Sequence, residues 1–392
     1  MNWKRPNTIT GSVAQGKKYF RREDIEDKIW HEVSQGNSVL FLAPRRVGKS
    51  SIVSYMAENP LEGFICKYEV IQAEDTIQGF FKRLIAMIRD SLSSLGKSKE
   101  WFSTWWDSWT IKTLGKDKVE IGHKEIDYRN IFFDLLDKLK ESKLKVVLFL
   151  DEFPDVVLNI FKKEGEGNAK QLLADIRTLC HEDKFKSTFV LVLLGSVGLS
   201  HIVKKVTGRN DKINQLHTEY LPPLTEDQSR AFLQFLLEGA TMQLSQEIQE
   251  FLLNKIGNYI PYYIQLLIEE CDEILYNEKR PELTKKDVVQ GYNNLLKKNV
   301  KFEDWDSRLS EYFNEIYPFL HNVLSKCADQ NKITKQEIYD IAVKHKMELQ
   351  WKASIDDILI ADGYIHEVQS SFYFVSPLLR DWWKSRHPIM KR

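Results

Sequence analysis

The residues near the amino end that are best suited to chemistry are Gly48, Lys49 and Ser50. They follow an apolar run from Ser38 to Leu42, which is typical of a strand buried on both faces. Apolar residues then recur at helical spacing, which predicts a helix that begins at about Lys49. Backbone N–H groups at the start of a helix have no intrahelical partner, so together with the helix dipole they can bind an anion.

A strand, a glycine-containing loop and a helix in this order predict a site for the phosphates of a nucleoside triphosphate with magnesium. Lys49 would reach the terminal phosphates, and the Ser50 hydroxyl would bind Mg²⁺. Ala43 stands where this motif has its first glycine, so an ordinary turn with a surface lysine is the alternative. The residues expected to contact the nucleotide in this loop are Pro44, Arg45, Arg46, Val47, Gly48, Lys49, Ser50 and Ser51.

Two adjacent carboxylates, Asp151 and Glu152, follow the apolar run from Lys145 to Leu150. The carboxyl end of a parallel strand is where such sheets bind ligands, which predicts that the pair lies beside the phosphate loop. Asp151 would orient Mg²⁺, a cation that prefers oxygen ligands, and Glu152 would deprotonate the attacking water. A solvated loop is the alternative for an isolated Asp-Glu pair.

Ser196 follows the next apolar run, which extends from Thr188 to Leu194. Its hydroxyl could bond the terminal phosphate or the attacking water, or it could be an ordinary turn serine. With Glu152, Asp151 and Lys49 it completes the predicted catalytic set.

The composition is that of a soluble globular protein. Of 392 residues, 43% are hydrophobic and 29% are charged, with 56 basic and 56 acidic side chains. A balanced charge gives no general attraction to nucleic acid or to anionic membranes. Since we find neither an apolar run of membrane-spanning length nor a signal-peptide core, we expect a cytoplasmic protein.

The four cysteines and nine histidines show no metal-ligand spacing, so we expect reduced core cysteines and no zinc site.

Five apolar runs with strand character occur in the first 225 residues, and helical patterns separate most of them. This alternation predicts an α/β domain with a five-stranded parallel sheet over residues 1–224. The strands are expected at Val39–Leu42, Phe64–Val70, Lys145–Leu150, Thr188–Leu194 and His217–Leu221.

Pro222 and Pro223 end the last strand, and Thr225 can cap the next helix. Helical patterns predict a helical lid domain over 225–300 and three helices with a two-stranded wing, a winged helix-turn-helix, over 301–392. The expected helices of that last domain are Glu311–Cys327, Thr334–His345 and Ser354–Asp362, and its strands are Gly363–Val368 and Phe372–Val375.

A tryptophan-rich segment at about 98–126 interrupts the spacing of the sheet domain. It has five aromatic residues between Trp101 and Trp109, and Lys112–Lys124 looks like a hairpin. We favour an insertion that packs on the sheet domain. The alternative is a partner-binding surface, because tryptophan is enriched at interface hot spots.

Taken together, Pro44–Ser50, Phe149–Phe153, Leu194–Ser196 and Leu221–Leu224 resemble the prokaryotic AAA+-like and STAND (signal-transducing) P-loop ATPases, which include archaeal-type ATPases akin to origin-recognition ATPases. The resemblance implies ATP or ADP with Mg²⁺ as cofactors. It also implies that Phe20, Arg22 and Pro261 lie near adenine or the nucleotide. Arg21 replaces the usual glycine of the entry motif, and neither Arg177 nor Arg209 can be assigned as an arginine finger, so slow hydrolysis is expected.

The expected DNA-reading helix of the winged helix contains Asp356 and Asp357, and the wing at 366–371 has no lysine or arginine. A DNA-binding face is normally basic, so a protein partner or self-association is favoured over nucleic acid.

The leading hypothesis is a nucleotide-dependent switch in which ATP binds between the sheet domain and the lid and controls the position of the winged helix. A DNA-associated ATPase of the origin-recognition or transposition-accessory kind is the alternative, and a scaffold that holds nucleotide without hydrolysing it is the third.

Overall fold

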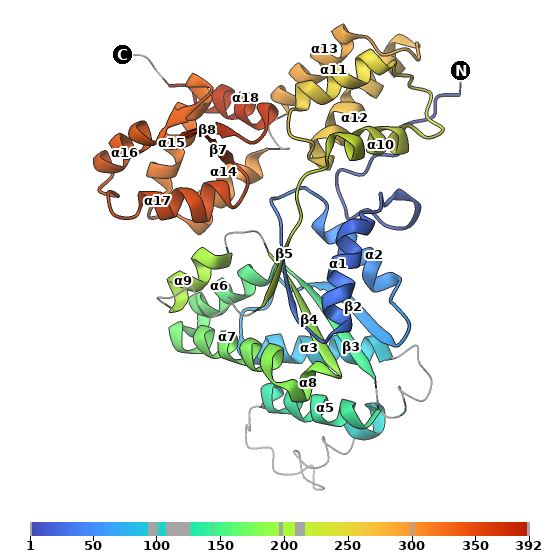
Figure 1. The fold of residues 1–392 in the computed structure, drawn as a ribbon, viewed down its shortest axis with the longest axis vertical. Coiled ribbons are helices and arrows are strands. Elements are labelled where there is room, and N and C mark those ends of the chain that lie inside the picture. Colours follow the sequence, from blue (N-terminus) through green and yellow to red (C-terminus); the bar gives the residue numbers. More distant parts are fainter. Residues whose placement is uncertain are drawn as a thin grey trace, which may run out of the picture. The chain divides into compact units, whose positions relative to one another are not determined.

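The computed structural model describes residues 2–92, 100, 102–106, 126–142, 144–195, 199–207, 216–298 and 302–389 (Figure 1). Contacts between residues divide the chain into two compact units. We call residues 21–42 and 49–220 the sheet unit, and residues 1–20, 43–48 and 221–392 the helical unit. Each is described by itself.

The sheet unit is built on a five-stranded parallel sheet with the strand order β2-β3-β4-β1-β5. Leu42 pairs with Gly195 and Leu150 pairs with Leu193, so the carboxyl ends of β1, β3 and β4 meet at one edge of the sheet. The predicted five-stranded parallel sheet is confirmed. Its strands are β1 (Val39–Leu42), β2 (Phe64–Val70), β3 (Lys145–Asp151), β4 (Phe189–Gly195) and β5 (His217–Tyr220).

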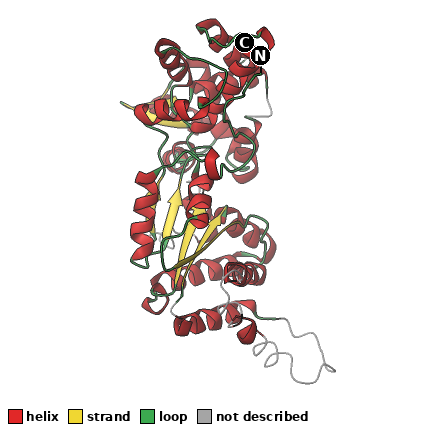
Figure 2. Cartoon of the chain, turned by 90° about the vertical axis from the view of Figure 1, so that its right-hand side faces the viewer, coloured by secondary structure: helices red, strands yellow, loops and turns green. Residues whose placement is uncertain are grey.

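Helices cover both faces of this sheet (Figure 2). The three central strands are buried along their length except for Lys145, which explains their unbroken apolar sequences. Among the helices, α6, α7 and α9 contact one another, α3 contacts α7, and α5 packs on α3. The helices are α1 (Glu23–Ser34), α2 (Lys49–Glu58), α3 (Ile77–Leu92), α5 (Tyr128–Ser142), α6 (Phe153–Glu164), α7 (Glu166–His181), α8 (Asp183–Lys186) and α9 (Leu199–Thr207).

The first part of the helical unit begins with a 3-10 turn, η1, and continues with four helices. The predicted cap of α10 is present, because Thr225 accepts a hydrogen bond from the Gln228 N–H and the Gln228 side chain accepts one from the Thr225 N–H. Residues before η1 lie along α12, where Trp3 and Arg5 both bond Asp272 at 3.0 and 2.7 Å. The elements are η1 (Gly16–Lys18), α10 (Glu226–Leu237), α11 (Gln246–Ile256), α12 (Pro261–Glu278) and α13 (Lys285–Lys297).

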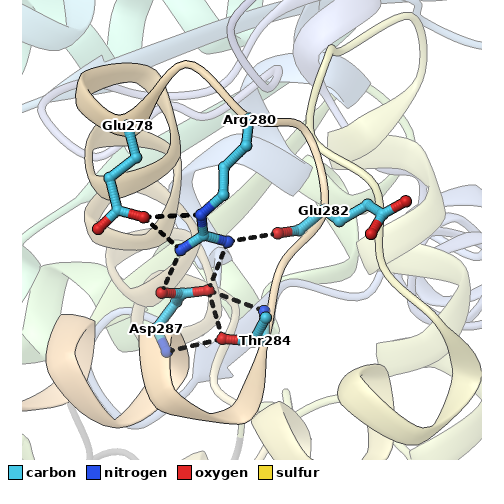
Figure 3. A network of polar contacts seen from close by, with 5 residues as sticks. All are labelled: Glu278, Arg280, Glu282, Thr284 and Asp287. Atoms are coloured by element: carbon cyan, nitrogen blue, oxygen red, sulfur yellow. Dashed lines mark hydrogen bonds and ion pairs between the residues drawn. The ribbon is translucent and has the colours of Figure 1, made fainter.

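A polar network holds the connection between α12 and α13 (Figure 3). The Arg280 guanidinium donates to both carboxylate oxygens of Asp287, at 2.6 and 2.9 Å, and also to Glu278 and to the Glu282 carbonyl. Thr284 adds its hydroxyl and its N–H to Asp287. Burial opposes the charge on Asp287, but the bonds from Arg280 and Thr284 outweigh it and lower the pKa of this carboxyl.

Residues 302–389 form helices around a three-stranded antiparallel sheet with the order β6-β8-β7. The predicted hairpin between β7 and β8 is present. Its turn is formed by Gln369 and Ser370, which have φ of 46° and 67°. A two-residue turn with both φ values positive matches the twist of the strands. The elements are α14 (Glu303–Tyr312), α15 (Tyr317–Gln330), β6 (Ile333–Thr334), α16 (Lys335–Lys344), α17 (Trp351–Ser354), the π-helical η3 (Ile355–Ile360), β7 (Ile365–Val368), β8 (Ser371–Phe374) and α18 (Pro377–Arg386).

The prediction of one helix over Glu311–Cys327 is wrong. The chain leaves helical conformation after Tyr312 and starts again at Tyr317. Pro318 explains the break, because proline has no N–H and fits only in the first turn of a helix.

Only part of the tryptophan-rich segment belongs to the described residues. Phe102 is buried there, and its ring lies 5.5 Å from that of Trp105 and 6.3 Å from that of Trp106. The expected hairpin at Lys112–Lys124 lies outside the described residues.

All four cysteines are free thiols, and three of them are buried. Within the described ranges, no helix combines the length and the apolar character needed to cross a bilayer.

Candidate nucleotide site

Asp151 is the last residue of β3, and its side chain is almost fully buried, with 4% exposed. A buried carboxylate must have hydrogen-bond or charge partners, because burial without them costs several kcal/mol. Ser50 donates its hydroxyl to Oδ2 at 2.5 Å, and Lys49 Nζ lies 3.6 Å from Oδ1. The structure therefore brings Asp151 into contact with two predicted residues, Lys49 and Ser50. Ser50 lies 101 positions from Asp151 in the sequence.

Lys49 and Ser50 occupy the first two positions of α2, directly after the loop that follows β1. A helix begins here because apolar residues, including Ile52 and Met56, are buried on one side of it. N–H groups in a first helical turn are available to an anion, and the helix dipole adds to that attraction. Lys49 is mostly buried, with 13% of its side chain exposed, so its charge acts in a medium that screens it less than bulk water does.

Glu152 links β3 to α6 and adopts a left-handed backbone conformation with φ of 58°. This conformation directs the Glu152 N–H to Asp151 Oδ1 at 3.0 Å. Non-glycine residues adopt it at an energetic cost, and such residues are often found at functional sites.

The neighbouring strand β4 ends at Gly195, where a Cβ would lie 2.7 Å from the Pro154 side chain. Ser196, the next predicted site residue, lies outside the described residues.

Tyr68 of β2 also contacts Asp151, and the sequence analysis did not identify it. Its hydroxyl lies 3.1 Å from Asp151 Oδ2, the oxygen that Ser50 also contacts. The signal that could have found it is the strand order, because β2 is paired with β3. That order depends on long-range pairing rather than on any local pattern.

The loop between β1 and α2 requires glycine at its end. Gly48 has φ of 102°, a conformation that disfavours residues with a Cβ, although nothing lies within 4 Å of where that Cβ would be. Arg46 is also left-handed, with φ of 68°. Open space beside a glycine with positive φ is consistent with a loop whose backbone faces a ligand.

Residues 43–48 pack within the helical unit. Arg46 forms an ion pair with Asp304 of α14 at 2.8 Å, and its guanidinium lies 4.6 Å from the centre of the Tyr262 ring. Arg45 donates to the Asp304 carbonyl at 3.4 Å. Burial lowers the pKa of the Arg45 guanidinium, and the positive charge of Arg308 lowers it further.

The remaining predicted residues are held by several elements. Pro44 lies against Gly363, where a Cβ would approach it to 2.8 Å. Val47 is buried and Ser51 is half-buried. The last three predicted residues are Phe20, Arg22 and Pro261.

These three residues have clear local roles. Phe20 packs its ring on Phe232 and Phe235 of α10, at 5.2 and 5.6 Å between ring centres. Arg22 is buried at the start of α1, and its N–H donates to Glu26 at 3.2 Å. Pro261 is the first residue of α12, where a missing N–H costs nothing.

The donor set around Asp151 fits a magnesium-bound triphosphate. Mg²⁺ prefers oxygen ligands, and the site offers a hydroxyl and a carboxylate within hydrogen-bond distance of each other. Because the Ser50 hydroxyl donates a hydrogen bond to Asp151, the lone pairs of its oxygen stay available to a cation. Lys49 supplies a positive charge for phosphate, next to the amino end of α2.

A scan against protein-family models found no match, and neither did a search of curated proteins. Solved structures do match. The Walker-type ATPase paby2304 of Pyrococcus abyssi is 16% identical with a TM-score of 0.64, and the match covers 95% of this chain and 97% of that one. The ORC2 protein of Aeropyrum pernix, solved in ADPNP–ADP complexes, is 11% identical with a TM-score of 0.52, and the match covers 93% of each chain. The chain therefore has the fold of these two proteins, which is the fold that the resemblance of its sequence motifs implied.

Proposed function

We propose that this protein binds ATP and ADP with Mg²⁺ and hydrolyses ATP slowly. The observation that carries the proposal is the convergence of Lys49, Ser50 and Asp151 at the carboxyl edge of the parallel sheet. Ligands of such sheets bind at this edge. The fold shared with a Walker-type ATPase and with an ORC2 protein solved with ADPNP and ADP supports the same ligand class.

Each residue has a proposed role in the reaction. Ser50 and Asp151 would hold Mg²⁺, which when bound neutralises charge on the phosphates. Lys49 and the N–H groups of the loop Pro44–Ser51 would bind the phosphates. Glu152 would accept the proton of the attacking water, and Ser196 would bond the terminal phosphate or that water.

We further propose that nucleotide binding controls a conformational switch. Arg46 of the phosphate loop is bound to Asp304 and Tyr262, which belong to α14 and α12. A phosphate group would compete with the Asp304 carboxylate for the Arg46 guanidinium, because both are anions that pair with its N–H groups. ATP and ADP would compete differently, which is the requirement for a ligand to shift a conformational equilibrium.

The proposed organisation has a P-loop core (1–224), a helical lid (225–300) and a winged helix (301–392), with Phe20, Arg22 and Pro261 near the nucleotide. We propose that the last domain contacts protein, either a partner or a second copy, rather than DNA. On its wing, Glu367 forms an ion pair with Lys335, and Lys352 forms one with Asp356 at 2.6 Å, so both cations already have carboxylate partners.

Exposed apolar side chains on the same domain support a protein contact. Tyr339 and Val343 are one helical turn apart on α16, and they are 40% and 46% exposed. Leu349, which follows in the chain, is 99% exposed.

The experiment that tests the proposal combines phosphate release with size-exclusion chromatography in ATP, in ADP and without nucleotide. We expect slow, Mg²⁺-dependent phosphate release and a nucleotide-dependent elution volume in the wild type, and neither in Lys49→Ala. Lys170→Ala, on the exposed surface of α7, is the matched control. Equal phosphate release by the wild type and Lys49→Ala would contradict the proposed enzyme activity.

A further inference from the structure

The side chain of Asp151 is held from three directions. Oδ2 accepts hydrogen bonds from the Ser50 hydroxyl at 2.5 Å and from the Tyr68 hydroxyl at 3.1 Å. Oδ1 accepts the N–H of Glu152 at 3.0 Å. These three hydrogen bonds hold the buried carboxylate in one orientation.

The three groups that donate to Asp151 differ in whether they have a second role in the proposed site. Ser50 is a proposed ligand of Mg²⁺, and the Glu152 N–H is fixed by the turn that joins β3 to α6. Tyr68 is the donor with no other role in the proposed site. It reaches Asp151 from β2, the edge strand that pairs with β3, with Tyr68 opposite Phe149 in the register.

The side chain of Tyr68 combines an O–H group, which can donate a hydrogen bond, with an aromatic ring. A phenylalanine would fill the same space on β2 and would lack only the hydroxyl, so the hydroxyl contributes the contact with Asp151 and the ring contributes the packing.

We propose that Tyr68 is a positioning residue that sets the affinity of the nucleotide site for Mg²⁺ by orienting the Asp151 carboxylate. The inference rests on the proposed function. Residues that orient a metal ligand through a hydrogen bond commonly change metal affinity or activity 10- to 100-fold when they are removed. Loss of the Tyr68 hydroxyl leaves Oδ2 with Ser50 as its donor, so the orientation of the carboxylate is less tightly fixed.

The test is the free Mg²⁺ concentration at half-maximal binding of a fluorescent ATP analogue. In Tyr68→Phe we expect this concentration to rise about tenfold or more. Binding of the same analogue in excess EDTA and the melting temperature should change little, because the ring and its packing remain. Tyr128→Phe, at the first residue of α5, is the matched control and should behave as the wild type does.

A double-mutant cycle separates positioning from a general structural effect. If Tyr68 acts through Asp151, then adding Tyr68→Phe to Asp151→Asn should not raise the Mg²⁺ requirement further. Additive effects of the two substitutions, or a Tyr68→Phe protein with the Mg²⁺ dependence of the wild type, would overturn this inference alone. Failure of the wild type to bind the analogue at any Mg²⁺ concentration would overturn the proposed function as well.

Discussion

At the scale of single residues, local motifs predicted Lys49, Ser50 and Asp151, because each one sits at the end of an element with a strong apolar pattern. The same reasoning could not find Tyr68, whose role depends on the pairing of β2 with β3. It could not find Asp304 either, which lies 258 positions from Arg46 in the sequence. Contacts of this kind arise from tertiary packing and have no local signature.

The role proposed for Glu152 can be tested by removing its charge. Glu152→Gln keeps the shape of the side chain but cannot accept a proton from water, so we expect ATP hydrolysis to fall about 100-fold or more. ATP affinity should remain close to that of the wild type, because Glu152 is not a proposed phosphate ligand. Single-turnover hydrolysis and equilibrium binding measure the two quantities. Glu182→Gln is the matched control, and hydrolysis at the wild-type rate in Glu152→Gln would eliminate the proposed base.

At the scale of elements, the strands were well predicted because buried strands have continuous apolar sequences with clear ends. The bounds of β1 and β2 match the predicted ones. Those of β3 and β5 differ by one residue at one end, and those of β4 differ by one residue at each end. The predicted helix from Glu311 to Cys327 was wrong, because apolar residues recur at helical spacing on both sides of Pro318 and concealed the break. The sequence did not predict that the residues before η1 lie along α12, because their contacts, such as those of Trp3 and Arg5 with Asp272, are polar and irregularly spaced.

The junction of β4 and α6 should depend on glycine. A Cβ at Gly195 would lie 2.7 Å from the Pro154 side chain, and the proline ring has little freedom to move away. We expect Gly195→Ala to destabilise the protein by about 1–3 kcal/mol, the usual cost of overpacking. Urea unfolding measures this change. Gly167→Ala on α7, where nothing lies within 4 Å, should be neutral or stabilising, and equal stability of the two variants would contradict this account.

The network at Arg280 should stabilise the connection between α12 and α13 in a pH-dependent way. Arg280→Ala removes both bonds to the buried carboxylate of Asp287, and we expect a loss of about 2 kcal/mol at neutral pH. Because the folded pKa of Asp287 is lowered, its contribution is present above the unfolded pKa of about 4 and is lost as the pH falls through the folded pKa.

Urea unfolding from pH 7 down to pH 3 measures this effect. The difference between the wild type and Arg280→Ala should therefore shrink below about pH 4. Arg89→Ala, an exposed arginine of α3, is the control. A difference that stays constant down to pH 3 would show that the charge of Asp287 is not what Arg280 stabilises.

At the scale of the whole molecule, the proposed switch depends on the contacts that residues 43–48 make within the helical unit. The ion pair of Arg46 with Asp304 is partly exposed, with 34% and 54% of the side chains accessible, so its contribution is below that of a buried pair. A formal charge of zero is consistent with regulation through such specific contacts rather than through a general electrostatic field.

If Asp304 competes with phosphate for Arg46, its removal should favour the nucleotide. We expect Asp304→Asn to raise ATP affinity about 2- to 5-fold, the range of a partly exposed ion pair. It should also reduce the difference in elution volume between the ATP-bound and nucleotide-free protein. Asp329→Asn, an exposed residue of α15 near Lys384, is the control. Weaker ATP binding in Asp304→Asn would contradict the competition.

The most direct test of the central claim is a calorimetric titration of the protein with ATP in the presence of Mg²⁺. Lys49, Ser50 and Asp151 should form one saturable site per chain, and Lys49→Ala should bind at least about tenfold more weakly, since it removes the buried cation that faces the phosphates. Absence of binding heat in the wild type at several temperatures, or equal affinity in Lys49→Ala, would contradict the claim that these three residues form a triphosphate site.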